Sequence, residues 1–230
     1  MPLLCFRVQG PDGSQISYKE SSSNPMDISG TYGPFKIDPG AQLTYDEPND
    51  VLTLANARLR STAGVTYARI SFWRVFTAPP AGTTSTNQAS YSVRARGTFS
   101  IPSGTQGTAW VSVRGYVASQ SLGPASDPPN PPACNLPGMT ACAVSGPPTA
   151  FILTRQKTIT LPSSRELKGR LWFKLLPNST LTFNVSKGIQ VKFGPPAGGE
   201  EEDITSSRPK KKKKKKKDKT STKRKQKSNR

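Results

Sequence analysis

Hydrophobic residues along positions 1–197 fall in short runs, separated by glycine, proline, asparagine and aspartate. The runs are rich in Val, Ile, Thr, Phe, Tyr and Trp, residue types that favour strands. No window keeps an apolar period of 3.6 residues, so little helix is expected. Strands are predicted at residues 3–8, 15–19, 35–37, 42–45, 51–60, 65–77, 91–101, 108–118, 151–161, 169–176, 179–186 and 189–193.

The longest run, residues 65–77, is nearly continuous in strand-forming residues. We therefore expect it at the centre of a sheet, with both faces at least partly covered. Residues 91–101 and 108–118 are expected to pair as a hairpin, because the glycine-containing segment 102–107 joins them. The series predicts an all-β fold, an antiparallel β-sandwich or jelly roll, with a barrel as the alternative.

A Pro-rich segment interrupts the strand pattern at residues 119–149, which contain eight prolines. We interpret it as a surface insertion in a single β body of residues 1–197; an inter-domain linker is the alternative. Beyond that body the only apolar residue is Ile204. A segment this polar cannot bury a core, so residues 198–230 are expected to form a disordered tail.

Charge changes this picture, because the 33 Lys and Arg and 14 Asp and Glu give a formal charge of +19. Residues 208–230 hold 15 basic residues against one acid, whereas residues 1–199 hold 18 basic and 9 acidic residues. Residues 200–203 are all acidic, and we interpret them as a solvated linker, with looping back onto the lysines as the alternative. Most of the excess charge therefore belongs to the tail.

The tail is the strongest functional signal in the sequence. Lysine runs neutralise phosphates and release counterions, and about 8 single-strand phosphates give a log–log salt slope near −6. The tail has no aromatic residue, so bases cannot stack there. A nuclear or nucleolar address and a solubilising or lipid-binding tail are alternatives. The expected nucleic-acid-binding residues are Lys210, Lys211, Lys212, Lys213, Lys214, Lys215, Lys216, Lys217, Lys219, Lys223, Arg224, Lys225 and Lys227.

A second basic feature lies in the body, where residues 51–126 contain seven arginines and neither lysine nor acid. Arg58 and Arg60 are two residues apart, as are Arg94 and Arg96, so each pair shares one face of its strand. These four are the candidate secondary basic face. With aromatic residues interleaved, such a face can hold phosphates and stack on bases; ordinary solvent-facing arginines are the alternative. The aromatic candidates are Tyr91, Tyr116, Trp73 and Trp110.

Catalytic and metal sites are not expected, and no cofactor is predicted. Without histidine, the chain lacks the usual general base near neutral pH and every His-containing zinc site. Asp46, Glu47 and Asp50 are interpreted as a polar turn. Cys134 and Cys142 can close a small loop, but they make an incomplete zinc site. No apolar stretch is long enough for a membrane span, and no cleaved signal peptide is expected.

A β body with a basic terminal arm resembles, in overall plan, the coat proteins of small non-enveloped viruses. The resemblance implies a jelly-roll body that self-assembles as a homo-oligomer in a virion. It also implies a tail that packages RNA or DNA without sequence specificity, and residues 119–149 as a projection or subunit contact. The alternative is a nuclear or nucleolar β-sandwich binding module of the histone or RNA chaperone type. In that case the tail serves as a localisation signal and as a tether.

Overall fold

The computed structural model describes residues 3–62, 64–75, 88–117, 120–122, 139–160 and 166–194. Within these ranges the chain forms strands and their connecting turns, and no helix. The strand pairs are antiparallel throughout the described part. The predicted all-β, antiparallel fold is therefore confirmed.

The strands form two sheets. In spatial order the first contains β12 (Gln120–Leu122), β11 (Ala109–Val117), β15 (Glu166–Leu175), β9 (Thr66–Val75), β1 (Leu3–Gln9) and β2 (Gln15–Ser21), and β13 (Thr140–Ala143) also pairs with β11. The second contains β3 (Met26–Asp27), β6 (Gln42–Asp46), β7 (Val51–Ala55), β17 (Ile189–Gly194), β10 (Gln88–Ile101), β16 (Thr180–Phe183), β8 (Arg58–Ser61), β5 (Phe35–Ile37) and β4 (Gly30–Tyr32), and β14 (Gly146–Thr160) pairs with β10.

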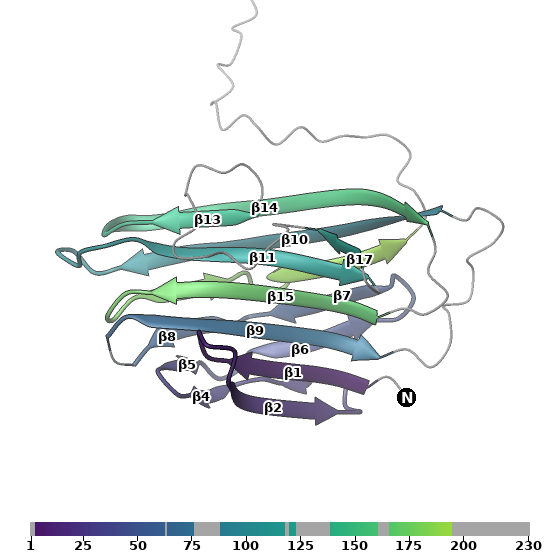
Figure 1. Cartoon of the computed structure of the whole chain (residues 1–230), viewed down its shortest axis with the longest axis horizontal. Coiled ribbons are helices and arrows are strands. Elements are labelled where there is room, and N and C mark those ends of the chain that lie inside the picture. Colours follow the sequence, from purple (N-terminus) through teal and green to yellow (C-terminus); the bar gives the residue numbers. More distant parts are fainter. Residues whose placement is uncertain are drawn as a thin grey trace, which may run out of the picture. The chain divides into compact units, whose positions relative to one another are not determined.

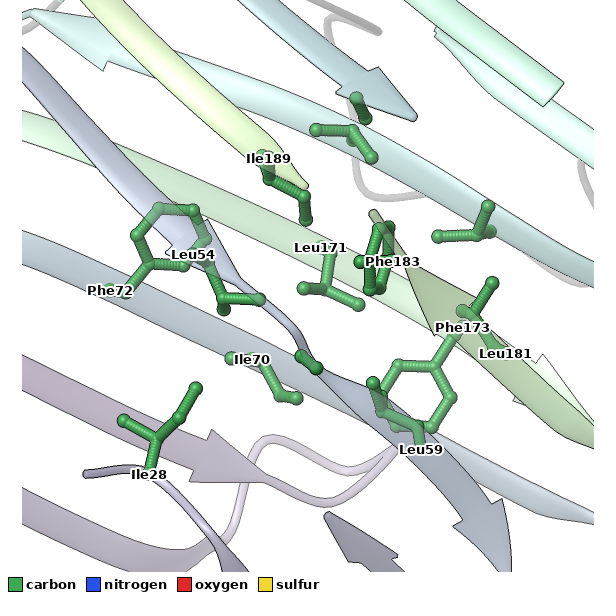
Figure 2. Close-up of a cluster of buried hydrophobic side chains, with 14 of the residues drawn as sticks. Ile28, Leu54, Leu59, Ile70, Phe72, Leu171, Phe173, Leu181, Phe183 and Ile189 are labelled. Carbon is green, nitrogen blue, oxygen red and sulfur yellow. The ribbon is translucent and has the colours of Figure 1, made fainter. Parts of the chain in front are cut away.

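The two sheets pack face to face around one hydrophobic core, with the first sheet in front in Figure 1. Phe35 of β5 and Phe173 of β15 meet edge to face across the sheets, with ring centroids 5.1 Å apart. Figure 2 shows part of this core, in which side chains from both sheets interdigitate. Those labelled are Ile28, Leu54, Leu59, Ile70, Phe72, Leu171, Phe173, Leu181, Phe183 and Ile189. Alternation along each strand places the remaining side chains on the two outer faces.

Two glycines make room for aromatic rings inside the sandwich. Gly115 of β11 and Gly169 of β15 lie directly opposite each other on the inner face of the first sheet. A Cβ on Gly169 would overlap the ring of Phe72, its partner on β9. A Cβ on Gly115 would overlap the hydroxyl of Tyr91, which reaches across from the second sheet. The close packing of the two sheets at this point therefore requires both glycines.

The strand predicted at residues 65–77 is confirmed as central, because β9 lies between β15 and β1. The strand predicted at residues 51–60 is instead two strands, β7 and β8. The break falls at Asn56, whose φ of 52° is left-handed. Asparagine tolerates this conformation better than other non-glycine residues, which is why a strand-forming run is interrupted there.

The predicted hairpin of residues 91–101 and 108–118 is wrong, because β10 and β11 belong to different sheets. β14 pairs with β10 along nearly its whole length and occupies one of its edges. β17 and β16 pair in turn along the other edge. No edge of β10 is left for β11, so residues 102–107 cross between the sheets.

Part of the Pro-rich segment 119–149 forms strands where a loop was expected. β12 and β13 pair with β11, and β14 begins at Gly146, ahead of Pro147 and Pro148. Proline lacks a backbone donor and is tolerated on edge strands, which explains how β14 accommodates two of them. Residues 123–138 lie outside the described residues.

Candidate nucleic-acid interface

The four arginines singled out in the sequence lie on the outer face of the second sheet. Arg94 and Arg96 alternate along β10 with buried residues, and Arg58 and Arg60 flank the buried Leu59 on β8. Only β16 separates these two strands, since its Thr182 pairs with Arg58 on one side and with β10 on the other. We call Arg58, Arg60, Arg94 and Arg96 the arginine face. The prediction that strand alternation groups each pair is confirmed.

Two lysines extend the arginine face. Lys36 of β5 is the direct neighbour of Arg60 on the next strand. Lys192 of β17 lies opposite Ser92, one outward position along β10 from Arg94. The outer face of the second sheet thus carries cations on β5, β8, β10 and β17, at spacings that strand pairing sets.

An acid from outside the acid-free stretch reduces the charge of this face. Arg60 donates from Nε to Asp38 Oδ1 at 2.8 Å, and its Nη2 lies 2.6 Å from the same oxygen. Arg58 Nε lies 3.8 Å from Asp38 Oδ2. Arg96 forms no ion pair with any residue that the structure describes. Among these four arginines, Arg96 is therefore the better candidate for an added phosphate.

The outer face of the first sheet carries a denser arrangement, in which aromatic rings and cations alternate. We call it the aromatic–cation face. Its rings are Tyr18, Tyr67, Trp73, Trp110, Tyr116 and Trp172, and its cations are Arg7, Arg69, Arg114, Lys168, Arg170 and Lys174. Cross-strand register aligns them in rows, such as Tyr116, Lys168 and Trp73 on β11, β15 and β9.

Each cation of this face lies close to a ring or a hydrogen-bonding partner. Lys168 Nζ is 4.9 Å and Arg7 Cζ 5.2 Å from the ring centroid of Trp73. Arg170 Cζ is 5.0 Å from the centroid of Tyr116, and Lys174 Nζ is 5.4 Å from that of Tyr67. Such cation–π contacts contribute about 0.5–1 kcal/mol each at exposed sites. They hold the long side chains against the sheet.

Hydrogen bonds fix the centre of the aromatic–cation face. The hydroxyl oxygen of Tyr116 accepts from Arg114 Nη1 at 2.9 Å and from Arg170 Nη1 at 3.3 Å. Arg170 also donates from Nε to Ser71 Oγ at 3.2 Å. Two guanidinium groups therefore converge on one hydroxyl, which leaves the hydrogen of that hydroxyl available to an acceptor above the sheet.

The four aromatic residues that the sequence suggested as neighbours of the arginines do not lie on the arginine face. Trp73, Trp110 and Tyr116 lie on the aromatic–cation face, away from the four arginines of the second sheet. Tyr91 is fully buried between the sheets, and burial raises the pKa of its hydroxyl. A missed signal was available in residues 168–174, where every second residue is basic or aromatic. That alternation marks the outward side of β15.

The tail residues predicted to bind nucleic acid, within 210–227, lie outside the described residues. Their role stays a prediction.

No cluster of three or more potential metal ligands occurs in the part of the chain that the structure describes. Asp50 accepts a hydrogen bond from the Tyr45 hydroxyl at 2.6 Å. Cys142 is disulfide-bonded, and Cys5 is buried with its sulfur 3.6 Å from the Tyr18 hydroxyl, while Cys134 lies outside the described residues. Among the described residues no helix is long and apolar enough to cross a membrane.

Comparison with known proteins does not assign the chain to a family. No protein-family model matches the chain, and no curated protein does. Among solved structures, an isomalto-dextranase of Arthrobacter globiformis T6, complexed with panose, matches with a TM-score of 0.23 and 11% identity. The match covers 81% of this chain but only 29% of the enzyme chain. A TM-score this low does not define a shared fold.

Proposed function

We propose that the protein is a structural, sequence-independent nucleic-acid-binding protein that assembles through its β body and packages a genome, as a coat protein does. The arginine face carries the proposal within the described residues, because it groups four outward cations on two strands of one sheet that only β16 separates. The lysine tail supports it from the sequence, since Lys210 begins an unbroken run of eight lysines. Phosphate is the common ligand of both features.

Assembly is the part of this proposal that separates it from its alternative. Many copies of one chain would place their tails at high local concentration, which raises avidity without stronger single contacts. Size-exclusion chromatography with light scattering, with and without RNA, is expected to give particles of tens of subunits. A monomer, or a small ring that stays small with RNA, would overturn the hypothesis of a coat protein. It would favour the alternative, a nuclear binding module of the histone or RNA chaperone type.

The arginine face predicts a specific salt dependence. Replacing Arg94 and Arg96 by glutamine removes two outward charges from β10. If each neutralises one phosphate, the log–log slope of affinity for single strands against salt becomes less negative by about 1.4. Fluorescence anisotropy of a labelled oligonucleotide at several salt concentrations measures this slope.

The matched control replaces Arg155 and Lys157 by glutamine. These two residues are also two positions apart, and replacing them also removes two charges. On β14, however, they pair with the inward-facing Val93 and Tyr91. They therefore belong to the opposite side of the same sheet. An equal change of slope in both variants would mean that only total charge matters and that the arginine face is not a binding surface.

A further inference from the structure

The aromatic–cation face is unusual in how much aromatic and cationic surface one sheet displays. All three tryptophans of the chain, Trp73, Trp110 and Trp172, lie on it. Trp110 and Trp172 are buried, whereas Trp73 and Tyr116 are partly exposed. Tyr18 is the most open ring, with 42% of its surface exposed. The exposed and partly exposed rings of this face, which include Tyr67, therefore lie on β2, β9 and β11.

The charges of this face are mostly of one sign. Its six cations come from β1, β9, β11 and β15, and among the described residues two acids lie in register with them, Glu20 of β2 and Glu166 at the start of β15. Glu20 is itself engaged, accepting a hydrogen bond from the Tyr18 hydroxyl at 2.7 Å. Like charges held this close repel one another, and a bound polyanion relieves that repulsion.

We propose that the aromatic–cation face is a binding site for single-stranded nucleic acid, separate from the arginine face. Unpaired bases stack on Tyr18 and Trp73, whose ring centroids are 6.0 Å apart. Phosphates lie against Arg7 and Lys168, the cations beside those rings, and against Arg170, which lies beside Tyr116. The proposal rests on the proposed function and adds the substrate class, an unpaired strand.

The repeating chemistry of a single strand matches this surface. Each nucleotide offers one planar base and one anion, and the face alternates rings with cations in the same way. A sheet surface bearing aromatic side chains stacks splayed bases, and a guanidinium plane serves as a further stacking surface. In a duplex the bases are paired and stacked on one another, so only the sugar–phosphate backbone can contact these rings. The face should therefore prefer single strands to duplexes.

The tryptophans make the site directly observable in the full-length protein. Titration with a thymidine oligonucleotide is expected to quench tryptophan fluorescence, because a base stacks on Trp73. An abasic oligonucleotide of equal length carries the same phosphates without bases. It is expected to bind through its charge but to leave the fluorescence nearly unchanged, and to bind about fivefold or more weakly, since stacking contributes about 1–3 kcal/mol per base.

Paired variants separate stacking from folding. Tyr18→Leu with Trp73→Leu removes both rings and is expected to weaken thymidine binding about fivefold or more, with no change for the abasic strand. Tyr18→Phe with Trp73→Phe keeps an aromatic ring at both positions, and it is expected to retain the preference for the thymidine strand over the abasic strand. Circular dichroism checks the fold of each variant, and if the leucine variant unfolds, the comparison of the two oligonucleotides on the unaltered chain decides.

The outcomes distinguish this proposal from the general one. Equal affinity for thymidine and abasic strands, with no quenching, overturns base stacking but leaves phosphate binding intact. Failure to bind either strand overturns the proposed function as well. Tighter binding of a duplex than of a single strand of the same length also overturns the proposal, because it places all of the affinity in backbone contacts.

Discussion

Deleting residues 208–230 is expected to lower the affinity for non-specific RNA by several orders of magnitude at 0.1 M salt, because about eight single-strand phosphate contacts with a slope near −0.7 each contribute that much between about 1 M and 0.1 M salt. The reason is that this segment holds 15 basic residues against one acid. The log–log salt slope should become less negative by about 6 in the same variant. Anisotropy titrations of a labelled RNA over a range of salt concentrations measure both quantities.

A tail of unchanged length provides the control for this deletion. Replacing the eight lysines of residues 210–217 by glutamine keeps the segment and removes most of its charge. This variant is expected to reproduce most of the loss of RNA affinity that the deletion causes. If the truncated chain instead binds as tightly as the complete one, with the same slope, the sheet faces of the body are the binding surface and the tail has another role.

Replacing Gly169 by alanine is expected to lower the free energy of unfolding by about 1–3 kcal/mol, the usual cost of overpacking a core. The added Cβ would overlap the ring of Phe72 on β9, and both residues lie between the sheets. For a domain of this size the melting temperature should fall by about 2–12 °C. Thermal unfolding followed by circular dichroism measures the change.

Gly194→Ala is the matched control for the packing argument. Gly194 also lies in a strand, β17, but a Cβ there would meet only Lys192 Cε at 3.8 Å, an ordinary contact. Its effect should stay within about 0.5 kcal/mol. If the two variants lose equal stability, the cost comes from replacing glycine in a strand and not from the contact with Phe72.

Local sequence patterns were enough to predict most of the longer strands and the outward position of the arginines. Alternation within β8 and β10 is a property of neighbouring residues, so Arg58 and Arg96 could be placed on strand faces from the sequence alone. The central position of β9 followed from its continuous run of strand-forming residues.

Partners distant in the sequence could not be predicted in this way. Asp38 pairs with Arg60 from 22 residues away, so an acid-free stretch of sequence is not acid-free in space. The aromatic–cation face joins Arg7 to residues as distant as Lys174, and no local pattern states which strands become neighbours. The hairpin error has the same origin, because the edges of β10 were already occupied by β14, β16 and β17.

The order of strands in the first sheet also sets when its outer surface can form during synthesis. β1, made first, lies beside β9, and β9 lies beside β15, which ends at Leu175. Pairings this distant in sequence form slowly, and here they must wait for late strands. A nascent chain that has not yet released β15 from the ribosome lacks Lys168, Arg170 and Trp172. The outer surface of the first sheet is therefore complete only after β15 has emerged and paired with β9.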